Sequence, residues 1–446
     1  MKDTPINFDV VSRKIKESKL ENIGKASIRE IKKLIDEIEK ETGDKFVRME
    51  MGIPGLPAAK IGVDAEINAL KKGVANTYPD IQGIPALKKE SSRFVKLFLD
   101  VDVNPEGCIP TVGSMQGSFA AFITVNRMYK EKDTILFLDP GFPVHKQQLK
   151  VLGQKWETFD VYDYRGEKLR DKLESYLSHG NISGMLYSNP NNPSWICFTE
   201  KELKIIAELA DKYNVVVLED LAYVGMDFRK NLYTPGKPPY QATVARYTNN
   251  FILFISNSKA FSYAGQRIGM MIISNELFEK VCPDLKRNYT TGIFGRAMIF
   301  GTVYALSAGV THSAQYAVTA MLKAANDGKF NFIDIVKEYG AKAKIMKKLF
   351  TDNGFKIVYD KDEDELIADG FYFTFSYPGF SGEELLSELI YYGISAISLA
   401  ITGSTRLEGI RACVSLVQRD QFPDLELRLK KFHQHHPINE TSLKQN

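Results

Sequence analysis

The chain has 446 residues, of which 44% are hydrophobic and 25% charged, and its formal net charge is +3 at pH 7. This length allows one large core and a smaller one, because single cores stop growing at roughly 250–300 residues. The balanced charge argues against nucleic acid or an anionic membrane as the main partner. The N-terminus lacks the apolar segment of a signal peptide and the four cysteines are widely spaced, so we expect a cytoplasmic protein with reduced thiols.

Histidine usage argues against a metalloenzyme. Three of the six histidines, His433, His435 and His436, crowd the C-terminus, where we expect a disordered tail. They have no nearby cysteine and no sheltering pocket, and the rest of the chain keeps only three scattered histidines. We therefore expect no metal site.

The first predicted element is an amphipathic helix over residues 28–41. Apolar residues recur there at helical spacing, after a possible N-cap at Ser27 and before Gly43. Such a helix needs a partner surface. A glycine- and proline-rich loop follows at residues 52–57.

From about residue 107 the chain alternates short apolar runs with helical patterns, which favours a three-layer αβα domain with a mainly parallel, seven-stranded sheet. The predicted strands are Cys108–Val112, Thr134–Leu138, Trp156–Phe159, Gly184–Ser188, Val215–Glu219, Phe251–Ser256 and Ile268–Ile273. The last two are joined by a loop too short for a helical crossover, so one of them is expected to run antiparallel.

After about residue 325 the pattern is that of a smaller α+β domain. A long helix is predicted over residues 332–350, followed by short strands at 355–358, 371–375, 394–397 and 410–414. We expect the N-terminal helix to pack with this part. The predicted organisation is residues 1–70 and 326–446 as the two parts of a discontinuous small domain, with residues 71–325 as the large domain.

The lysine of the segment 256–261 follows directly after a predicted buried strand. Lys259 therefore lies at a strand's carboxyl end, where open α/β sheets bind ligands. A lysine that is partly desolvated there can lose its proton and become a nucleophile toward a carbonyl. Taken alone, a solvated surface lysine is the better interpretation. Arg267, eight residues on, could bind a phosphate.

An aspartate and a tyrosine follow the strand 215–219. Asp220 at that strand end would keep a heteroaromatic ring nitrogen protonated, because the ion pair favours both charged forms. Tyr223 could donate a hydrogen bond to a phenolate oxygen. An N-cap aspartate is an equally good interpretation in isolation.

Three more strand ends carry residues suited to a ligand site. Residues 188–195, with two Asn-Pro steps, either form an ordinary turn or line the site. The turn containing Gly113, Ser114 and Met115 exposes backbone N–H groups at a helix start, which suits a phosphate. Phe142 could stack on a planar ring, although a core aromatic is the better interpretation alone.

Together these motifs resemble, in order and spacing, the pyridoxal 5'-phosphate (PLP) enzymes of fold type I, in the class I/II aminotransferase family. The resemblance covers residues 46–417 and includes Ser-x-x-Lys, Asp-x-x-Tyr, the Asn-Pro loop, the Gly-Ser-Met turn and Gly-Ile-Arg-Ala near the end. It implies a ping-pong transfer of an amino group from an L-amino acid to a 2-oxo acid, through an internal aldimine at Lys259. The amino acid is expected to be of the aspartate/glutamate type or broad/aromatic.

The resemblance also implies roles for the individual residues. Lys259 would also be the general base, Asp220 would pair with the ring nitrogen, and Tyr223 and Asn192 would bind the ring 3-oxygen. The residues expected around the phosphate and ring are Gly113, Ser114, Met115, Ser256, Arg267 and Phe142, together with Tyr78 across a homodimer interface.

Substrate recognition is implied at other positions. Arg411 would bind the α-carboxylate, because its planar guanidinium suits a planar anion, with help from the backbone of Gly52 and Ile53. Arg287 lies near the place where aspartate-specific relatives carry a side-chain carboxylate arginine, and a surface arginine is at least as good an interpretation. We hypothesise that it favours dicarboxylates.

One residue departs from the family pattern, and two other reactions stay open. The family often has Asn-Pro-Thr-Gly where this chain has Asn192-Pro193-Ser194-Trp195, so Trp195 alters the loop exit or the pocket wall. A PLP-dependent carbon–sulfur lyase or an amino-acid decarboxylase would use the same lysine, aspartate and arginine. A non-catalytic PLP protein finds no support, because every catalytic position carries a competent residue.

Overall fold

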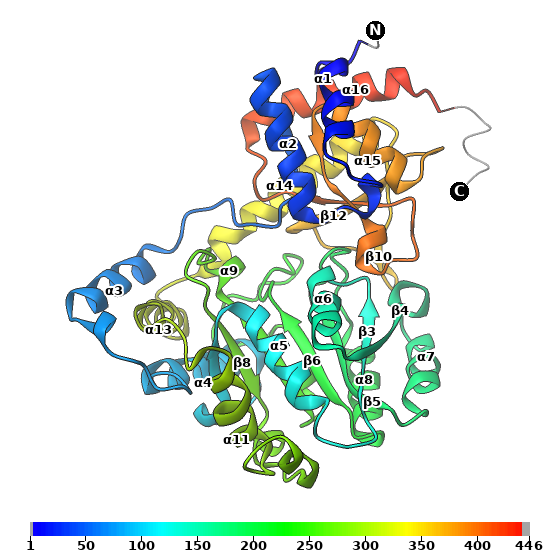
Figure 1. Cartoon of the computed structure of the whole chain (residues 1–446). Helices are drawn as coiled ribbons and strands as arrows, with labels where there is room; N and C mark the ends of the chain where they lie inside the picture. Colours follow the sequence, from blue (N-terminus) through cyan, green and yellow to red (C-terminus); the bar gives the residue numbers. More distant parts are fainter. Residues whose placement is uncertain (1–2, 439–446) are drawn as a thin grey trace. The chain divides into compact units, whose positions relative to one another are not determined.

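A computed structural model describes residues 3–438, which form two compact units. Unit 1 contains residues 3–55, 192–196 and 337–438, and unit 2 contains residues 56–191 and 197–336 (Figure 1). The predicted domain boundaries at 70/71 and 325/326 stay a prediction. By backbone packing the chain divides at 55/56 and 336/337, and the short segment 192–196 is assigned with the two terminal segments.

Unit 2 is built on a seven-stranded sheet in the order β2-β8-β7-β6-β5-β3-β4. All pairs are parallel except the two made by β8, which runs antiparallel to β2 and β7, as the short connection predicts. The strands are β2 (Cys108–Thr111), β3 (Thr134–Asp139), β4 (Lys155–Asp160), β5 (Ile182–Ser188), β6 (Val216–Leu221), β7 (Phe251–Ser256) and β8 (Gly269–Ile273).

Helices complete the three layers of unit 2. They are α3 (Lys60–Lys71), α4 (Pro85–Leu99), α5 (Gly113–Val125), α6 (Pro143–Leu152), α7 (Lys168–Leu177), α8 (Glu200–Lys212), α9 (Asn257–Ala260), α10 (Asn275–Glu279), α11 (Phe294–Arg296), α12 (Tyr304–Ser307) and α13 (His312–Asn326). Local signals set their ends. A reciprocal capping box between Thr199 and Glu202 begins α8, and Gly153 ends α6 in the left-handed conformation that favours glycine.

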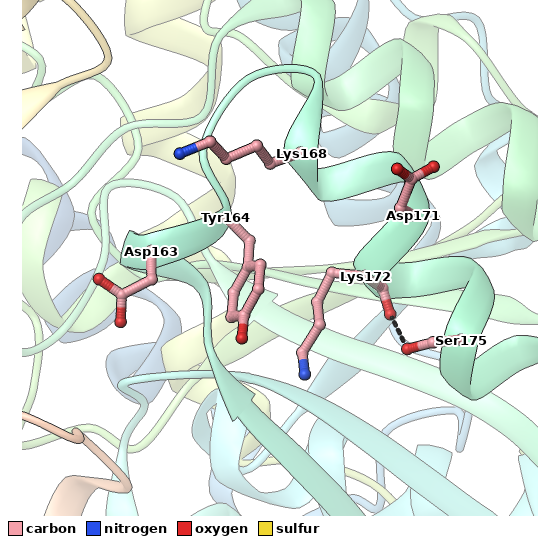
Figure 2. Close-up of a pocket in the computed structure, with 6 residues that line it drawn as sticks. All are labelled: Asp163, Tyr164, Lys168, Asp171, Lys172 and Ser175. Atoms are coloured by element: carbon pink, nitrogen blue, oxygen red, sulfur yellow. Dashed lines mark hydrogen bonds between the residues drawn. The ribbon is translucent and has the colours of Figure 1, made fainter.

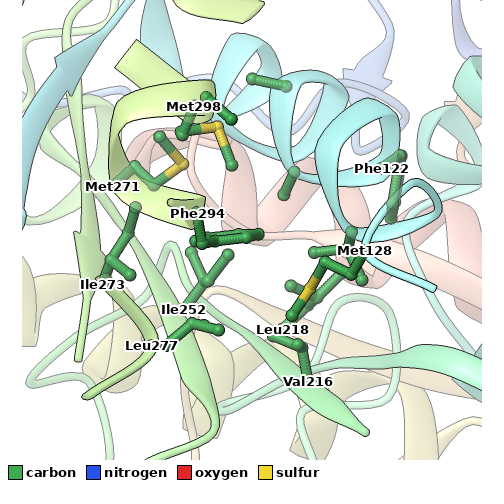
Figure 3. Close-up of a cluster of buried hydrophobic side chains, with 14 of the residues drawn as sticks. Phe122, Met128, Val216, Leu218, Ile252, Met271, Ile273, Leu277, Phe294 and Met298 are labelled. Atoms are coloured by element: carbon green, nitrogen blue, oxygen red, sulfur yellow. The ribbon is translucent and has the colours of Figure 1, made fainter. Parts of the chain in front are cut away.

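The main core of unit 2 lies between the sheet and α5. Val216 and Leu218 of β6 and Ile252 of β7 belong to one buried cluster with Phe122 of α5 (Figure 3). Burying side chains of this size contributes about 1.5–3 kcal/mol each. Because side chains alternate along a strand, Asp220 extends from the same face of β6 as Val216 and Leu218.

Unit 1 combines helices with small sheets. The helices are α1 (Phe8–Glu17), α2 (Ile28–Thr42), α15 (Gly382–Tyr391), α16 (Phe422–His435) and the part of α14 (Phe332–Asp352) that follows residue 336. An antiparallel sheet has the order β14-β15-β12-β9, with β14 (Ile397–Ser398), β15 (Ile410–Cys413), β12 (Tyr372–Ser376) and β9 (Lys356–Ile357), and β1 (Val47–Arg48) pairs with β13 (Ile394–Ser395). A hairpin joins β10 (Lys361–Asp362) to β11 (Glu365–Leu366).

The predicted first helix is confirmed as α2. Ser27 forms a capping box with Glu30, and Gly43 closes the helix in the left-handed conformation. The expected disordered tail is wrong in its first part, because His433 and His435 belong to α16. The helix is held there by packing and hydrogen bonding, since Tyr377 Oη lies 2.7 Å from His433 Nδ1. Residues 439–446 of that expected tail lie outside the described residues.

Between residues 3 and 438, no helix is both long enough and apolar enough to cross a bilayer.

Candidate functional site

Lys259 lies in α9, a single helical turn directly after β7. Ser256, the last residue of β7, caps this turn, because its hydroxyl accepts a hydrogen bond from Ser258 N at 3.2 Å. Lys259 is thereby fixed at the carboxyl end of β7. Two residues of β6 lie close by in the pairing, since Asp220 faces Phe254 and Leu221 faces Ile255.

Asp220 is a buried carboxylate within electrostatic reach of Lys259. It accepts a hydrogen bond from Ala222 N at 3.0 Å. Burial raises the pKa of Asp220 to about 7, while the positive charge of Lys259 acts in the opposite direction. A carboxylate in this setting is stabilised by a further cationic partner. Tyr223, one turn on, is also buried.

A second cluster surrounds the start of α5. No side chain caps the N-terminus of this 13-residue helix. Gly113 has φ +66°, and a Cβ added to it would lie 2.6 Å from Nη2 of Arg267, so the absence of a side chain leaves room for the guanidinium. Arg267 is exposed, and no carboxylate among the described residues forms an ion pair with it. Ser114 lies close to Gly269, whose added Cβ would be 2.9 Å from Ser114 N.

Strand pairing brings these clusters to one edge of the sheet. Gly269 of β8 faces Thr111 of β2 on one side and Ser256 of β7 on the other. The turn after β2 and the lysine turn after β7 therefore flank the same strand. A phosphate held between the N-terminus of α5 and Arg267 would lie beside Ser256.

The remaining residues predicted in this unit are more dispersed. Phe142 precedes α6 and contacts the ring of His145, with centroids 5.6 Å apart. Met115 is in the first turn of α5, and its carbonyl accepts a hydrogen bond from Gln148 at 2.8 Å. Tyr78 is 93% exposed.

Arg287 ends a short 3-10 helix, Pro283–Arg287, on the surface of unit 2. Its side chain is 46% exposed, and its Nε lies 3.6 Å from the carboxylate of Asp284. The same Nε donates to the Asp284 carbonyl at 3.2 Å. These local contacts match those of a surface arginine.

In unit 1, Arg411 of β15 is 1% exposed. Its Nη2 donates to the Glu50 carbonyl at 2.5 Å and its Nη1 to Asn192 Oδ1 at 3.3 Å. The guanidinium carbon lies 4.5 Å from the ring centroid of Tyr372. Nε of Arg411 is buried and has no hydrogen-bond partner within residues 3–438. Arg411 is thus a buried cation that keeps a donor available for an anion.

The two loop residues predicted beside Arg411 belong to the same unit. A Cβ added to Gly52 would overlap the hydroxyl of Tyr372, so a glycine is needed for that close approach. The carbonyl of Ile53 accepts a hydrogen bond from Ser415 Oγ at 2.5 Å. These contacts fix the loop near β15.

Sequence reasoning missed four residues that support these positions. Tyr372 contacts Arg411, and nothing in its strand pattern distinguishes it from a core aromatic. Tyr263, in the lysine loop, donates to a carboxylate oxygen of Glu66 on α3, which anchors the loop. Ser313 of α13 donates to the other oxygen of Glu66 at 2.9 Å.

A surface cavity elsewhere in unit 2 contains none of the predicted site residues. It has a volume of about 510 Å³ and is lined by Asp163, Tyr164, Lys168, Asp171, Lys172 and Ser175 (Figure 2). The Lys172 ammonium lies 4.6 Å from the ring centroid of Tyr164. The cavity is formed by α7 and the 3-10 helix Val161–Tyr164 before it.

Comparison with known proteins identifies the family. Residues 54–364 match the model of the family described as aminotransferase class I and II. The chain is 25% identical over 359 residues to a probable aspartate aminotransferase of Methanocaldococcus jannaschii, covering 80% of this chain and 83% of that protein. It is 28% identical over 270 residues to an LL-diaminopimelate aminotransferase of Aquifex aeolicus, covering 59% and 66%.

The fold agrees. The solved structure of an alanine aminotransferase from Pyrococcus furiosus superimposes with a TM-score of 0.74 at 19% identity, covering 92% of this chain and 97% of that one. The protein is therefore an α/β transferase of fold type I. It belongs to the class I and II aminotransferases, a family that depends on PLP.

The residues of unit 2 fit PLP. The uncapped start of α5 with Arg267 suits its phosphate, and the buried Asp220 suits a protonated ring nitrogen. Lys259 lies within electrostatic reach of Asp220, where the aldehyde of the same molecule would be held.

Proposed function

We propose that the chain transfers the amino group of an L-amino acid to a 2-oxo acid by a ping-pong mechanism, with Lys259 and Asp220 as its central catalytic groups. The observation that carries this proposal is the buried Asp220 carboxylate, which lies near the carboxyl end of β6 and interacts electrostatically with Lys259 after β7. When bound, PLP supplies the electron sink and carries the amino group between the two substrates.

The side chains divide the work. Lys259 Nζ takes the proton from the substrate Cα and returns it later in the reaction. When PLP is bound, the carboxylate charge of Asp220 would keep the ring nitrogen protonated. Tyr223 and Asn192 would donate hydrogen bonds to the ring 3-oxygen. Arg411 binds the α-carboxylate with the donor that its own contacts leave available.

Phosphate binding is assigned to the start of α5. Gly113, Ser114 and Met115 present their backbone to it, and Arg267 supplies the positive charge. Ser256 contributes its position at the end of β7, and Phe142 is assigned to the ring face.

A second copy of the chain is part of the proposal. We assign Tyr78 to the phosphate of a partner subunit in a homodimer, and its 93% exposure supports this, because an exposed tyrosine is available to a neighbour. A cytoplasmic setting is proposed as well, supported by four buried cysteines that form no disulfide.

The amino acid is proposed to be a dicarboxylate, aspartate or glutamate, or one of a broader aromatic set. The relatives named above are called aspartate, LL-diaminopimelate and alanine aminotransferases, and several others also carry the name aspartate aminotransferase. Their names support amino-acid transamination, and they differ in the side chain of the amino-acid substrate.

A single-turnover screen tests the function. Purified holoenzyme is mixed with each amino acid in the absence of any 2-oxo acid. A transaminase releases at most one equivalent of 2-oxo acid per subunit and no free ammonia, because the amino group stays on the enzyme. A carbon–sulfur lyase would release ammonia or sulfide continuously, and a decarboxylase would release carbon dioxide. Either outcome would replace the proposal with that rival.

A further inference from the structure

Trp195 occupies a backbone conformation that favours glycine. Its φ is +65°, a region that residues with a Cβ rarely adopt. The side chain is nevertheless 1% exposed, in a segment assigned to unit 1. A large aromatic kept in an unfavourable conformation points to a specific packing role.

The indole lies over a glycine and beside a tyrosine. A Cβ added to Gly370 would overlap the indole of Trp195, so Gly370 creates the space that the indole fills. The rings of Trp195 and Tyr372 meet edge to face, with centroids 6.1 Å apart and an interplanar angle of 65°. Trp195 thus supports one side of the Tyr372 ring.

Tyr372 in turn lies against Arg411. The two residues are on the paired strands β12 and β15, where Tyr372 faces Cys413 and Arg411 faces Thr374. The guanidinium is 4.5 Å from the ring centroid, within the range of a cation–π interaction. Removing the ring would take away one of the contacts that orient this buried cation.

The same short segment reaches Arg411 from a second direction. Asn192, three residues before Trp195, accepts a hydrogen bond from Nη1 of Arg411. Glu50 contacts Arg411 through its carbonyl, whereas its carboxylate is bonded to Arg48 and Ser395. No carboxylate within residues 3–438 forms an ion pair with Arg411. Its charge is oriented by neutral groups alone and stays available to an anionic ligand.

We propose that Trp195 is a positioning residue for carboxylate binding. It holds the Tyr372 ring against Arg411, and together with Asn192 it makes the segment 192–196 a two-sided support for the guanidinium. The ligand is the α-carboxylate of the amino acid or 2-oxo acid. This inference rests on the proposed function, which assigns that carboxylate to Arg411.

Kinetics of the holoenzyme provide the first test. Trp195→Gly removes the indole and places a glycine where the backbone has a positive φ. Gly370→Ala displaces the indole without removing it. Each is expected to raise KM for the amino acid, and the inhibition constant of propanoate, by roughly 3- to 30-fold, the range of one cation–π contact. The kcat should change much less. Trp195→Phe should restore part of the binding, because a smaller ring still reaches Tyr372.

The chain has only one other tryptophan, which provides a matched control. Trp156 is on β4 of unit 2 and is 38% exposed, so Trp156→Phe should leave KM and the inhibition constant unchanged. In this background Trp195 is the only tryptophan. Its emission should then change saturably with propanoate, with a midpoint equal to the inhibition constant. Arg411→Lys in the same background should abolish the saturable change.

The outcomes separate the two proposals. If Arg411→Lys weakens both constants while Trp195→Gly and Gly370→Ala leave them within about twofold of wild type, Trp195 has no positioning role. An emission that does not respond to propanoate in the Trp156→Phe holoenzyme also overturns that role. If Arg411→Lys itself changes neither constant, the assignment of Arg411 fails, and with it this part of the proposed function.

Discussion

Ser188 of β5 and Asp220 of β6 face each other at the carboxyl ends of two parallel strands. The Asp220 carbonyl accepts a hydrogen bond from Asn189 N at 3.1 Å, so the Asn-Pro loop begins beside the aspartate. On the other side of β6, the strand β7 leads into the lysine turn. Three segments that are far apart in sequence thus begin at neighbouring positions on one sheet edge.

Lys259 should be the residue that binds PLP covalently. Borohydride reduction of the holoenzyme should fix the cofactor on Lys259 as a pyridoxyl label, which peptide mass spectrometry detects. Lys259→Ala should lose both this label and transfer activity. Lys88 is an internal control, because burial lowers the pKa of its ammonium while three backbone carbonyls accept hydrogen bonds from it. Label on Lys88, or an active Lys259→Ala enzyme, would contradict the assignment.

Asp220 should lower the stability of the cofactor-free protein at high pH. Its pKa is raised from 3.8 to about 7, so between these values the folded state holds a proton that the unfolded chain has lost. The bound proton therefore adds to the free energy of unfolding, fully below pH 3.8, and this stabilisation is lost as the pH rises through 7. Asp220→Asn should therefore raise the unfolding temperature of the cofactor-free protein at pH 8, by the equivalent of a few kcal/mol, and much less at pH 5.

Glu219 is the matched control for Asp220. It is the preceding residue, extends from the opposite face of β6, and burial raises its pKa to about 7 as well. Its carboxylate is already bonded to Thr243 and Val244. Glu219→Gln should show the same pH trend in stability and retain most turnover, whereas Asp220→Asn should lose most of it. Equal turnover in the two variants would remove Asp220 from the mechanism.

The phosphate site can be tested with two glycines of the same backbone conformation. Gly113 and Gly153 have φ +66° and +64°, so alanine should cost about 1–2 kcal/mol of stability at either position. Only at Gly113 would the new Cβ meet Arg267, since Gly153 has nothing within 4 Å.

Gly113→Ala should therefore weaken PLP binding measured by equilibrium dialysis, and Gly153→Ala should not. Arg267→Ala should weaken PLP roughly 10- to 100-fold, the effect of one charge-assisted hydrogen bond, and leave pyridoxal, which lacks the phosphate, unaffected. An equal loss for both compounds would show that Arg267 acts on the fold.

Arg287 is the proposed determinant of dicarboxylate preference. Arg287→Ala should lower kcat/KM for aspartate relative to leucine, because the side-chain carboxylate loses a cation. The variant Arg296→Ala, at another surface arginine of the same unit, provides the comparison. If the ratio of kcat/KM for aspartate to that for leucine is unchanged in Arg287→Ala, Arg287 does not determine substrate preference and only contacts Asp284 on the surface.

Local patterns in the sequence determined much of the fold. All seven strands of the large sheet are predicted, and continuous apolar runs mark the fully buried ones, because strands buried on both faces need no polar alternation. The edge strand β4 is largely exposed and has polar residues between Trp156 and Phe159. Ser27 and Gly43 delimit α2 by capping alone. The residues at strand ends, Lys259 and Asp220 among them, could be selected because parallel strands bring their carboxyl ends to one edge.

Tertiary structure alone decided which side chains meet. The sequence contains no signal that Tyr372 lies on Arg411, because that contact depends on the pairing of two strands nearly 40 residues apart, a spacing that any loop could produce. The histidines near the C-terminus likewise suggest a tail, although His433 and His435 belong to α16, where they contact Tyr377 and Tyr392 respectively. For Trp195, the sequence showed only that a tryptophan stands where the family pattern often has a glycine. Its left-handed backbone and its place over Gly370 come from packing between distant segments, which local propensity does not encode.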